Sequence, residues 1–120
     1  MGYSLAGLFA LWAAYESDVF SGIVCCSGSL WFPDWDYYVR DHMIQSKCSV
    51  YLSLGGKEEK TKNKVMAAVG DRTRAQERLL QEDSMVESVV LEWNAGGHFA
   101  DAGKRLAKGV KWMFGVKSGL

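Results

Sequence analysis

Three short apolar runs alternate with longer helical segments along this chain, and this alternation constrains the fold more than any other feature. The runs cover residues 22–27, 49–54 and 88–93, and the first of them contains the β-branched residues Ile23 and Val24. Runs of this kind are typical of strands that are covered on both faces of a sheet. Helices between them allow the strands to run parallel, with right-handed crossovers. The sequence therefore predicts an α/β fold in which three parallel strands alternate with helices.

Four segments have helical patterns, and they cover residues 5–16, 34–46, 62–81 and 100–116. The first is apolar on every side, which predicts a helix that is buried all round. The third contains Gly70, where a glycine favours a kink or a break. The last has an apolar face opposite a row of lysines, and such a row usually faces solvent.

Composition indicates one globular domain over residues 1–120, with 48% apolar and 23% charged residues. Because 14 basic residues balance 14 acidic ones, no overall field attracts nucleic acid or an anionic membrane. Cys25, Cys26 and Cys48 are too few for a disulfide framework and lack the spacing of a metal site. We therefore predict reduced thiols, a cytoplasmic location, no metal and no cofactor.

The stretch from Gly2 to Ala6 has the pattern Gly-x-Ser-x-small, with Ser4 at its centre. In this pattern a sharp turn between a strand and a helix leaves the serine hydroxyl exposed. Small residues two positions before and after the serine are needed because the two backbones approach closely there. Only Met1 precedes Gly2, so we expect the strand that leads into the turn to be missing.

An acidic segment follows the second apolar run, and His98 follows the third. The order serine, acid, histidine along the chain is the order found in α/β-hydrolases. A parallel sheet would bring residues that follow its strands to one edge. Ser4, His98 and an acidic side chain are therefore expected to meet there.

Four segments carry a more specific resemblance, and they are residues 2–8, 27–31, 51–60 and 96–99. They resemble the esterase family of α/β-hydrolases that includes enterobactin-type siderophore esterases and S-formylglutathione hydrolases. The resemblance covers nearly the whole chain but only the C-terminal half of the family's domain. It implies a partial esterase-like domain over residues 1–120 that lacks the N-terminal strands.

The resemblance also implies roles for individual residues. Ser4 would be the nucleophile and His98 the general base, and the family's acid position points to Glu58, with Glu59 as the alternative. The amide of Leu5, directly after the nucleophile, would stabilise the oxyanion. The implied activity is hydrolysis of a small-molecule ester through an acyl-enzyme on Ser4.

Aromatic residues near the expected site have two possible roles. Trp31, Phe32 and Trp35 follow the first apolar run, where they either line a pocket or cover the edge of the core. We predict that Trp31 and Tyr3 contact the substrate. His42 lies among charged residues in a helical segment, so a solvent-facing side chain is expected.

Two alternatives to the serine esterase remain open. The chain could be a non-catalytic fragment or interaction domain that retains the esterase pattern. A cysteine hydrolase that uses Cys25 or Cys26 is disfavoured because both lie inside an expected strand. Whichever function holds, the first predicted strand, over residues 22–27, would present an unpaired edge because the strand before it is missing. The apolar helix over residues 5–16 would lack part of its packing. We therefore predict a homo-oligomer formed through the exposed sheet edge.

Overall fold

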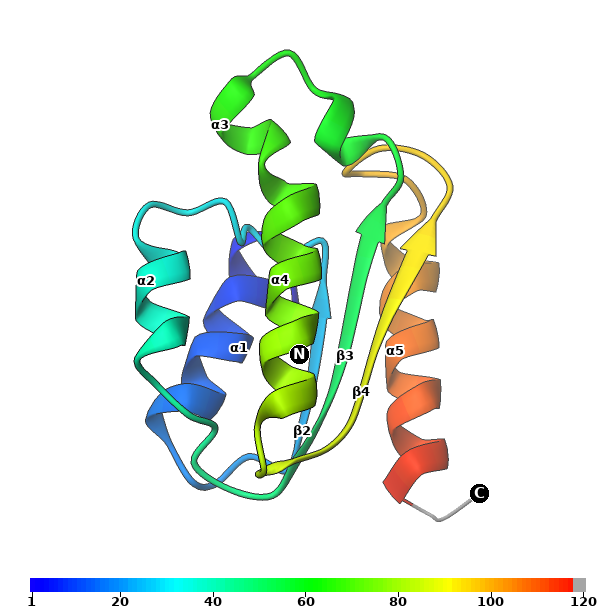
Figure 1. Cartoon of the computed structure of the whole chain (residues 1–120). Coiled ribbons are helices and arrows are strands. Elements are labelled where there is room, and N and C mark those ends of the chain that lie inside the picture. The colour runs from blue at the N-terminus through cyan, green and yellow to red at the C-terminus, as the bar shows by residue number, and fades with distance from the viewer. Residues whose placement is uncertain (118–120) are drawn as a thin grey trace.

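Parallel strands with helices between them form the framework of the chain, as the computed structural model shows for residues 1–117 (Figure 1). The elements in order are β1 (Gly2–Tyr3), α1 (Leu5–Glu16), β2 (Gly22–Cys26), α2 (Trp35–Arg40), β3 (Cys48–Gly55), the 3-10 helix η1 (Glu58–Lys60), α3 (Lys64–Ala67), α4 (Val69–Glu82), β4 (Val86–Asn94) and α5 (Ala102–Lys117). The predicted α/β fold with parallel strands is confirmed. The predicted number of three strands is wrong, because the described residues form a sheet of four.

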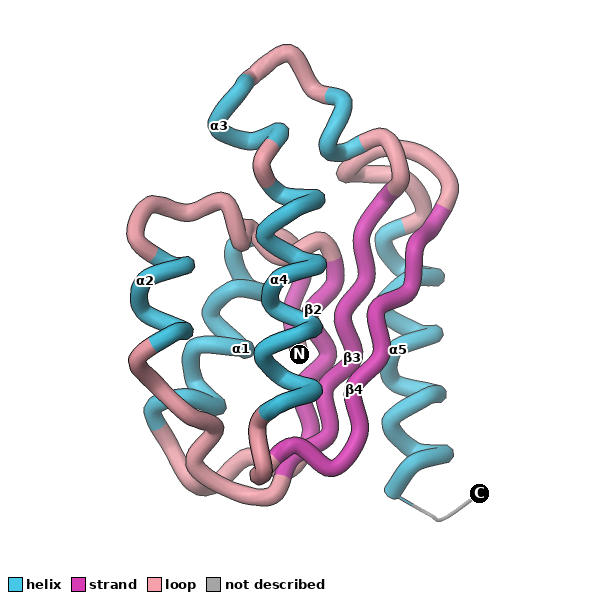
Figure 2. The backbone as a smooth tube through the Cα atoms, in the orientation of Figure 1, coloured by secondary structure: helices cyan, strands magenta, loops and turns pink. Residues whose placement is uncertain are grey.

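The sheet has the strand order β1-β2-β3-β4, and every neighbouring pair is parallel (Figure 2). The extra strand is β1, which we expected to be missing. Its two residues pair with Cys25 and Cys26 of β2. This pairing fixes the direction in which the chain enters the turn at Ser4.

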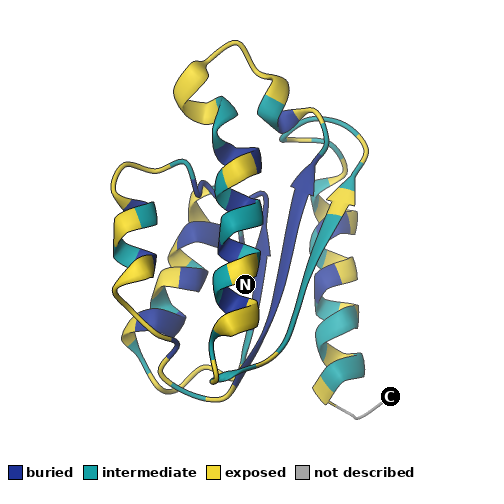
Figure 3. Ribbon diagram, viewed as in Figure 1, coloured by how far each residue is buried: buried dark blue, intermediate teal, exposed yellow. Residues whose placement is uncertain are grey.

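Helices cover both faces of the sheet. α1, α2 and α4 lie on one face and α5 lies on the other (Figure 1). Successive residues of β2 and β3 therefore enter different cores, because side chains alternate across a strand. Val24 and Tyr51 pack beneath α5, whereas Ile23 and Val50 belong to the core beneath α1 and α4. Every residue of β3 is buried, as expected for a central strand (Figure 3).

Three helices differ from their predicted bounds, and the last of them, α5, is displaced by only one or two residues at each end. The helix expected over residues 34–46 ends at Arg40, and the chain beyond it is irregular, with the Ile44 amide donating to Asp83. The helix expected over residues 62–81 is divided at Ala68, two residues before Gly70. A side chain at Gly70 would collide with Glu59, so this glycine permits a close approach of η1 to α4. No helix among the described residues is long and apolar enough to cross a membrane.

The prediction that the first helix is buried all round is wrong. Leu8 and Leu11 of α1 face the core, whereas Leu5, Phe9 and Trp12 are exposed, Phe9 to 64%. The reason is that α1 packs through one side only against the sheet and its neighbouring helices. Its other side, in the part of the chain that the structure describes, forms an apolar surface.

The outermost strand on this side is β1 and not, as predicted, the strand over residues 22–27, because β1 pairs with Cys25 and Cys26. Self-association through the apolar surface of α1 and the sheet edge stays a prediction. We expect the chain to sediment as a dimer or larger at micromolar concentration, because burying Phe9 and Trp12 removes apolar area from water. Replacing both residues by glutamate should yield a monomer with unchanged helical content. A glutamate at Tyr37, which is equally exposed on α2, should leave the oligomer intact. A wild-type chain that is monomeric at every concentration would contradict the prediction.

Candidate active site

Ser4 lies in a sharp turn between β1 and α1. Its backbone dihedral φ is 62° and ψ is −124°, a conformation that non-glycine residues rarely adopt. A Cβ atom at Gly2 would lie 2.2 Å from the carbonyl oxygen of Ala6, so only glycine fits there. The Ser4 amide donates to the carbonyl of Cys26 over 3.0 Å, which ties the turn to the end of β2. Gly2 of the sequence pattern thus has the steric reason that we predicted.

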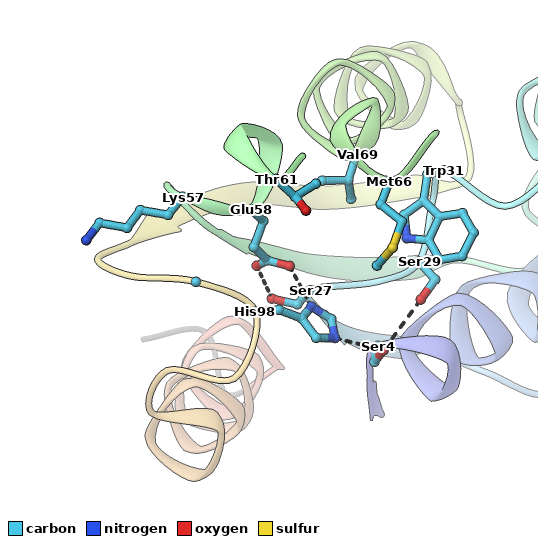
Figure 4. A pocket seen from close by; sticks show the side chains of 11 residues that line it. Ser4, Ser27, Ser29, Trp31, Lys57, Glu58, Thr61, Met66, Val69 and His98 are labelled. Atoms are coloured by element: carbon cyan, nitrogen blue, oxygen red, sulfur yellow. Dashed lines mark hydrogen bonds and ion pairs between the residues drawn. The ribbon is translucent and has the colours of Figure 1, made fainter. Parts of the chain in front are cut away.

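Ser4, His98 and Glu58 form a continuous chain of polar contacts (Figure 4). His98 Nε2 lies 2.9 Å from Ser4 Oγ, and His98 Nδ1 lies 2.6 Å from Glu58 Oε1. The three residues follow β1, β4 and β3, so the parallel sheet brings them to the same edge. The Glu58 side chain is only 5% exposed and that of His98 is 27% exposed. The imidazole therefore lies between a buried carboxylate and a hydroxyl at the surface of a cavity.

Hydrogen bonds fix the orientation of Glu58. Its Oε2 atom accepts from the Gly55 amide over 2.6 Å and from the Ser27 hydroxyl over 2.5 Å. This leaves Oε1 to face His98 Nδ1. Because a carboxylate only accepts, we assign the proton of a neutral His98 to Nδ1, which leaves Nε2 to accept from Ser4. The arrangement has the hydrogen-bond directions that a general base at His98 requires.

Glu59, the alternative acid, lies elsewhere. Both of its carboxylate oxygens accept from Arg74 at 3.0 Å. The hydrogen bonds from Arg74 hold the pKa of Glu59 below its ordinary value. Of the two adjacent glutamates, the geometry thus brings Glu58 and not Glu59 to the histidine.

A cavity of about 230 Å³ opens beside Ser4 and His98. Trp31 is among its lining residues, with Met66 and Val69 opposite the polar groups (Figure 4). The other two aromatic candidates lie differently: Phe32 is exposed, and Trp35 is buried in the core, where its indole donates to Gln76 over 2.9 Å. Trp31 is therefore a pocket residue, whereas Trp35 covers the core edge. His42 is exposed, as predicted.

Tyr3 and Leu5 flank the nucleophile but have different surroundings. The Tyr3 hydroxyl donates to the backbone carbonyl of His98 and accepts from Arg105 Nη1 over 2.8 Å, and Tyr3 is not among the residues that line the cavity. Its contact with substrate stays a prediction. Leu5 is the first residue of α1, where backbone amides have no partner within the helix. The role of its amide as an oxyanion donor likewise stays a prediction.

The structure adds three polar residues that the sequence reasoning missed. Ser27 holds Glu58, Ser29 Oγ lies 3.5 Å from Ser4 Oγ, and Arg105 lies buried beneath the site. A signal for Arg105 was present in the sequence. It is spaced three residues from Ala102 and four from Gly109. This spacing places a charged residue on the apolar row of its helix.

The cysteines are free and buried. Burial raises the pKa of the Cys25 thiol to about 12 and that of Cys48 to about 11, and it also raises the pKa of Cys26. At about pH 8 all three are therefore protonated, and a thiol reacts only as its thiolate. We expect no rapid reaction of the native chain with a disulfide reagent at this pH, and release of three equivalents in denaturant. One fast equivalent in the native chain would contradict this.

No cluster of three or more His, Cys, Asp or Glu side chains among the described residues could hold a metal ion. The polar groups at the site instead pair with one another.

The parallel sheet, the helices on both faces and the turn at Ser4 define part of an α/β-hydrolase fold. Searches against protein-family models and against curated protein sequences gave no match. Similar solved structures include the siderophore hydrolase EstA from Aspergillus nidulans, with a TM-score of 0.74 and 16% identity, covering 94% of this chain and 46% of that one. EstB, a siderophore hydrolase of the same organism, has a TM-score of 0.73 and 20% identity, covering 91% of this chain and 45% of its own.

An IroE-like serine hydrolase from Shewanella oneidensis has a TM-score of 0.73 and 18% identity, and the match covers 94% of this chain and 38% of that one. The chain thus spans less than half the length of these structural neighbours. At this level of identity the likeness establishes the fold. It confirms the fold that the sequence resemblance implied, namely part of the α/β-hydrolase fold.

Proposed function

We propose that this chain is the part of a serine ester hydrolase that carries the nucleophile, the base and the acid. The observation that supports the proposal best is the contact of His98 with Ser4 at 2.9 Å and with Glu58 at 2.6 Å. A serine hydroxyl is a weak nucleophile unless a neighbouring base takes its proton. These two contacts provide that base and the carboxylate that orients it.

In the proposed reaction, Ser4 Oγ attacks the ester carbonyl while His98 Nε2 takes its proton. The amide of Leu5 donates to the developing oxyanion. Collapse of the tetrahedral intermediate breaks the bond to the alcohol, which leaves with the proton from His98. A water molecule then attacks the acyl group on Ser4, with His98 again as the base, and releases the acid.

The cavity supports a small-molecule ester as substrate. Its volume of about 230 Å³ suits a short acyl or alcohol group, and Trp31, Met66 and Val69 provide an apolar wall. Two structural neighbours are siderophore hydrolases, so a siderophore ester belongs in a substrate panel beside simple esters.

The proposed reaction requires no cofactor. The three free, buried cysteines fit the proposed cytoplasmic location, where thiols stay reduced.

Burst kinetics with p-nitrophenyl acetate and p-nitrophenyl butyrate test this proposal. An acyl-enzyme predicts a rapid release of p-nitrophenol with an amplitude equal to the concentration of the chain, followed by slower turnover. The alternative is a non-catalytic interaction domain, which the exposed apolar side of α1 favours. It predicts release at the rate of the buffer alone, and that result would refute the esterase proposal for this chain.

A further inference from the structure

Arg105 is a charged residue in a place where charges are rarely found. It lies on α5, beneath the sheet, and is only 2% exposed. Burying an unpaired guanidinium is costly, so a residue of this kind normally has partners for its donors. The identity of those partners shows which part of the molecule the charge serves.

The guanidinium contacts one residue associated with each of the four strands. Nε donates to Asn94 Oδ1 over 3.1 Å at the end of β4, and Nη1 donates to the Tyr3 hydroxyl over 2.8 Å in β1. Nη2 donates to the Ser27 hydroxyl, directly after β2, and lies 3.6 Å from Glu58 Oε2, which follows β3. A single side chain thus connects the strand ends that carry the proposed catalytic groups.

Two of these contacts connect Arg105 to His98 through intermediate residues. On one side, Arg105 holds Ser27, which donates to Glu58 Oε2, so that Oε1 faces the imidazole. On the other side, Arg105 holds the Tyr3 hydroxyl, which donates to the backbone carbonyl of His98. Both the partner of the ring and the backbone that carries the ring are therefore fixed through the same guanidinium.

Charge supports the same conclusion. The side chains of Glu58 and Arg105 are 5% and 2% exposed, so the carboxylate has its counter-ion inside the protein. Removing one partner of a buried pair leaves an uncompensated charge that reorganises or draws in water. Removal of Arg105 would therefore disturb the Glu58 carboxylate, which is the group that orients His98. Glu59, the residue after Glu58, forms a comparable ion pair with Arg74. That pair is partly exposed, and none of its described interactions is with His98.

We propose that Arg105 is a positioning residue for the reaction at Ser4, because its contacts with Ser27, Glu58 and Tyr3 hold the carboxylate and the backbone of His98. This inference rests on the proposed function. Arg105 touches no reacting atom; it acts through Glu58 and Tyr3. A merely structural role would lower stability on removal of Arg105 without changing the proton on His98.

Proton NMR of the His98 ring tests the inference without requiring turnover. The Nδ1 proton, held against Glu58, should give a far-downfield resonance that His98→Gln removes. Arg105→Met, which keeps the apolar stem but loses the charge and the donors, should shift this resonance upfield or broaden it beyond detection. Arg74→Met should leave it unchanged, since Arg74 pairs with Glu59. Circular dichroism establishes that each variant is folded.

Kinetics provide a second readout. Arg105→Met should lower kcat by up to about 100-fold, the effect of a small misplacement of catalytic groups, while KM changes little. Arg105→Met should lower kcat by a smaller factor in the Glu58→Gln background than in the wild-type chain, because the part of its effect that acts through the carboxylate is already lost there. Additive losses would mean that Arg105 acts independently of Glu58.

The outcomes separate this inference from the proposed function. If Arg105→Met does not fold, Arg105→Lys replaces it in the NMR experiment, because lysine keeps the charge but cannot contact all four partners. A displaced His98 resonance in that variant supports the inference, and an unmoved resonance overturns it. Hydrolysis that depends on Ser4, with an unchanged kcat and resonance in a folded Arg105 variant, overturns the positioning role and leaves the function intact. A resonance that responds to Arg105 in a chain without hydrolysis supports the positioning role and refutes the function.

Discussion

Replacing Ser4 by alanine is expected to reduce p-nitrophenyl ester hydrolysis to the rate of the buffer. Removing the nucleophile from a complete serine hydrolase costs about 10⁶-fold in kcat. Leu5 is the single oxyanion donor proposed for this chain, and a site with one donor in place of two has a rate about 10²–10³-fold lower. The difference between the wild-type chain and Ser4→Ala should therefore be roughly 10³–10⁴-fold.

The control for this measurement is Ser84→Ala. Ser84 is exposed in the turn that precedes β4. It therefore lies at the amino-terminal end of that strand, whereas the site lies beyond the carboxyl ends of the strands. Its removal should leave the rate within experimental error. Equal rates for the wild-type chain and Ser4→Ala would mean that any hydrolysis arises elsewhere in the molecule.

The second large effect is expected at Glu58. Glu58→Gln keeps the size of the side chain but removes its charge, and the amide can present a donor to His98 Nδ1. The imidazole would then carry its proton on Nε2, which faces Ser4 at 2.9 Å and could no longer accept. We expect a loss of up to about 10⁴-fold in kcat, the effect of the equivalent change in a serine protease.

Glu59→Gln is the matched control, since it makes the same change one residue further along. Glu59 pairs with Arg74 and not with His98, so its loss should alter kcat less than about threefold, as expected for a largely surface ion pair. Steady-state kinetics of both variants give the comparison. A larger loss for Glu59→Gln than for Glu58→Gln would contradict the assignment of the acid.

The sequence predicted the topology of the fold because strand and helix patterns are local properties. The central strand β3 is buried on both faces, and its prediction over residues 49–54 differs by one residue at each end from the observed Cys48–Gly55. The short strand β1 was missed because two residues carry no pattern, and only their pairing with β2 makes them a strand. The exposure of Phe9 was missed for a related reason, since composition does not reveal which sides of a helix have neighbours.

The site was predictable to the extent that topology alone determines it. Parallel strands end at one edge, so Ser4 and His98 were expected to meet, and the structure places them in contact. The choice between Glu58 and Glu59 was open because the side chains of adjacent loop residues point in different directions that the sequence does not reveal. Each direction depends on hydrogen-bond partners, such as Ser27 for Glu58 and Arg74 for Glu59. These partners are distant in the chain, and no local pattern connects them.

Intact-mass and peptide mass spectrometry after treatment with a fluorophosphonate probe test the central claim most directly. The probe forms a covalent adduct only with a serine whose hydroxyl is activated by a base. We predict one adduct per chain, located on Ser4, and none in His98→Gln, because the imidazole is the base 2.9 Å away. An unmodified native chain, or an adduct on another serine such as Ser29, would contradict the account.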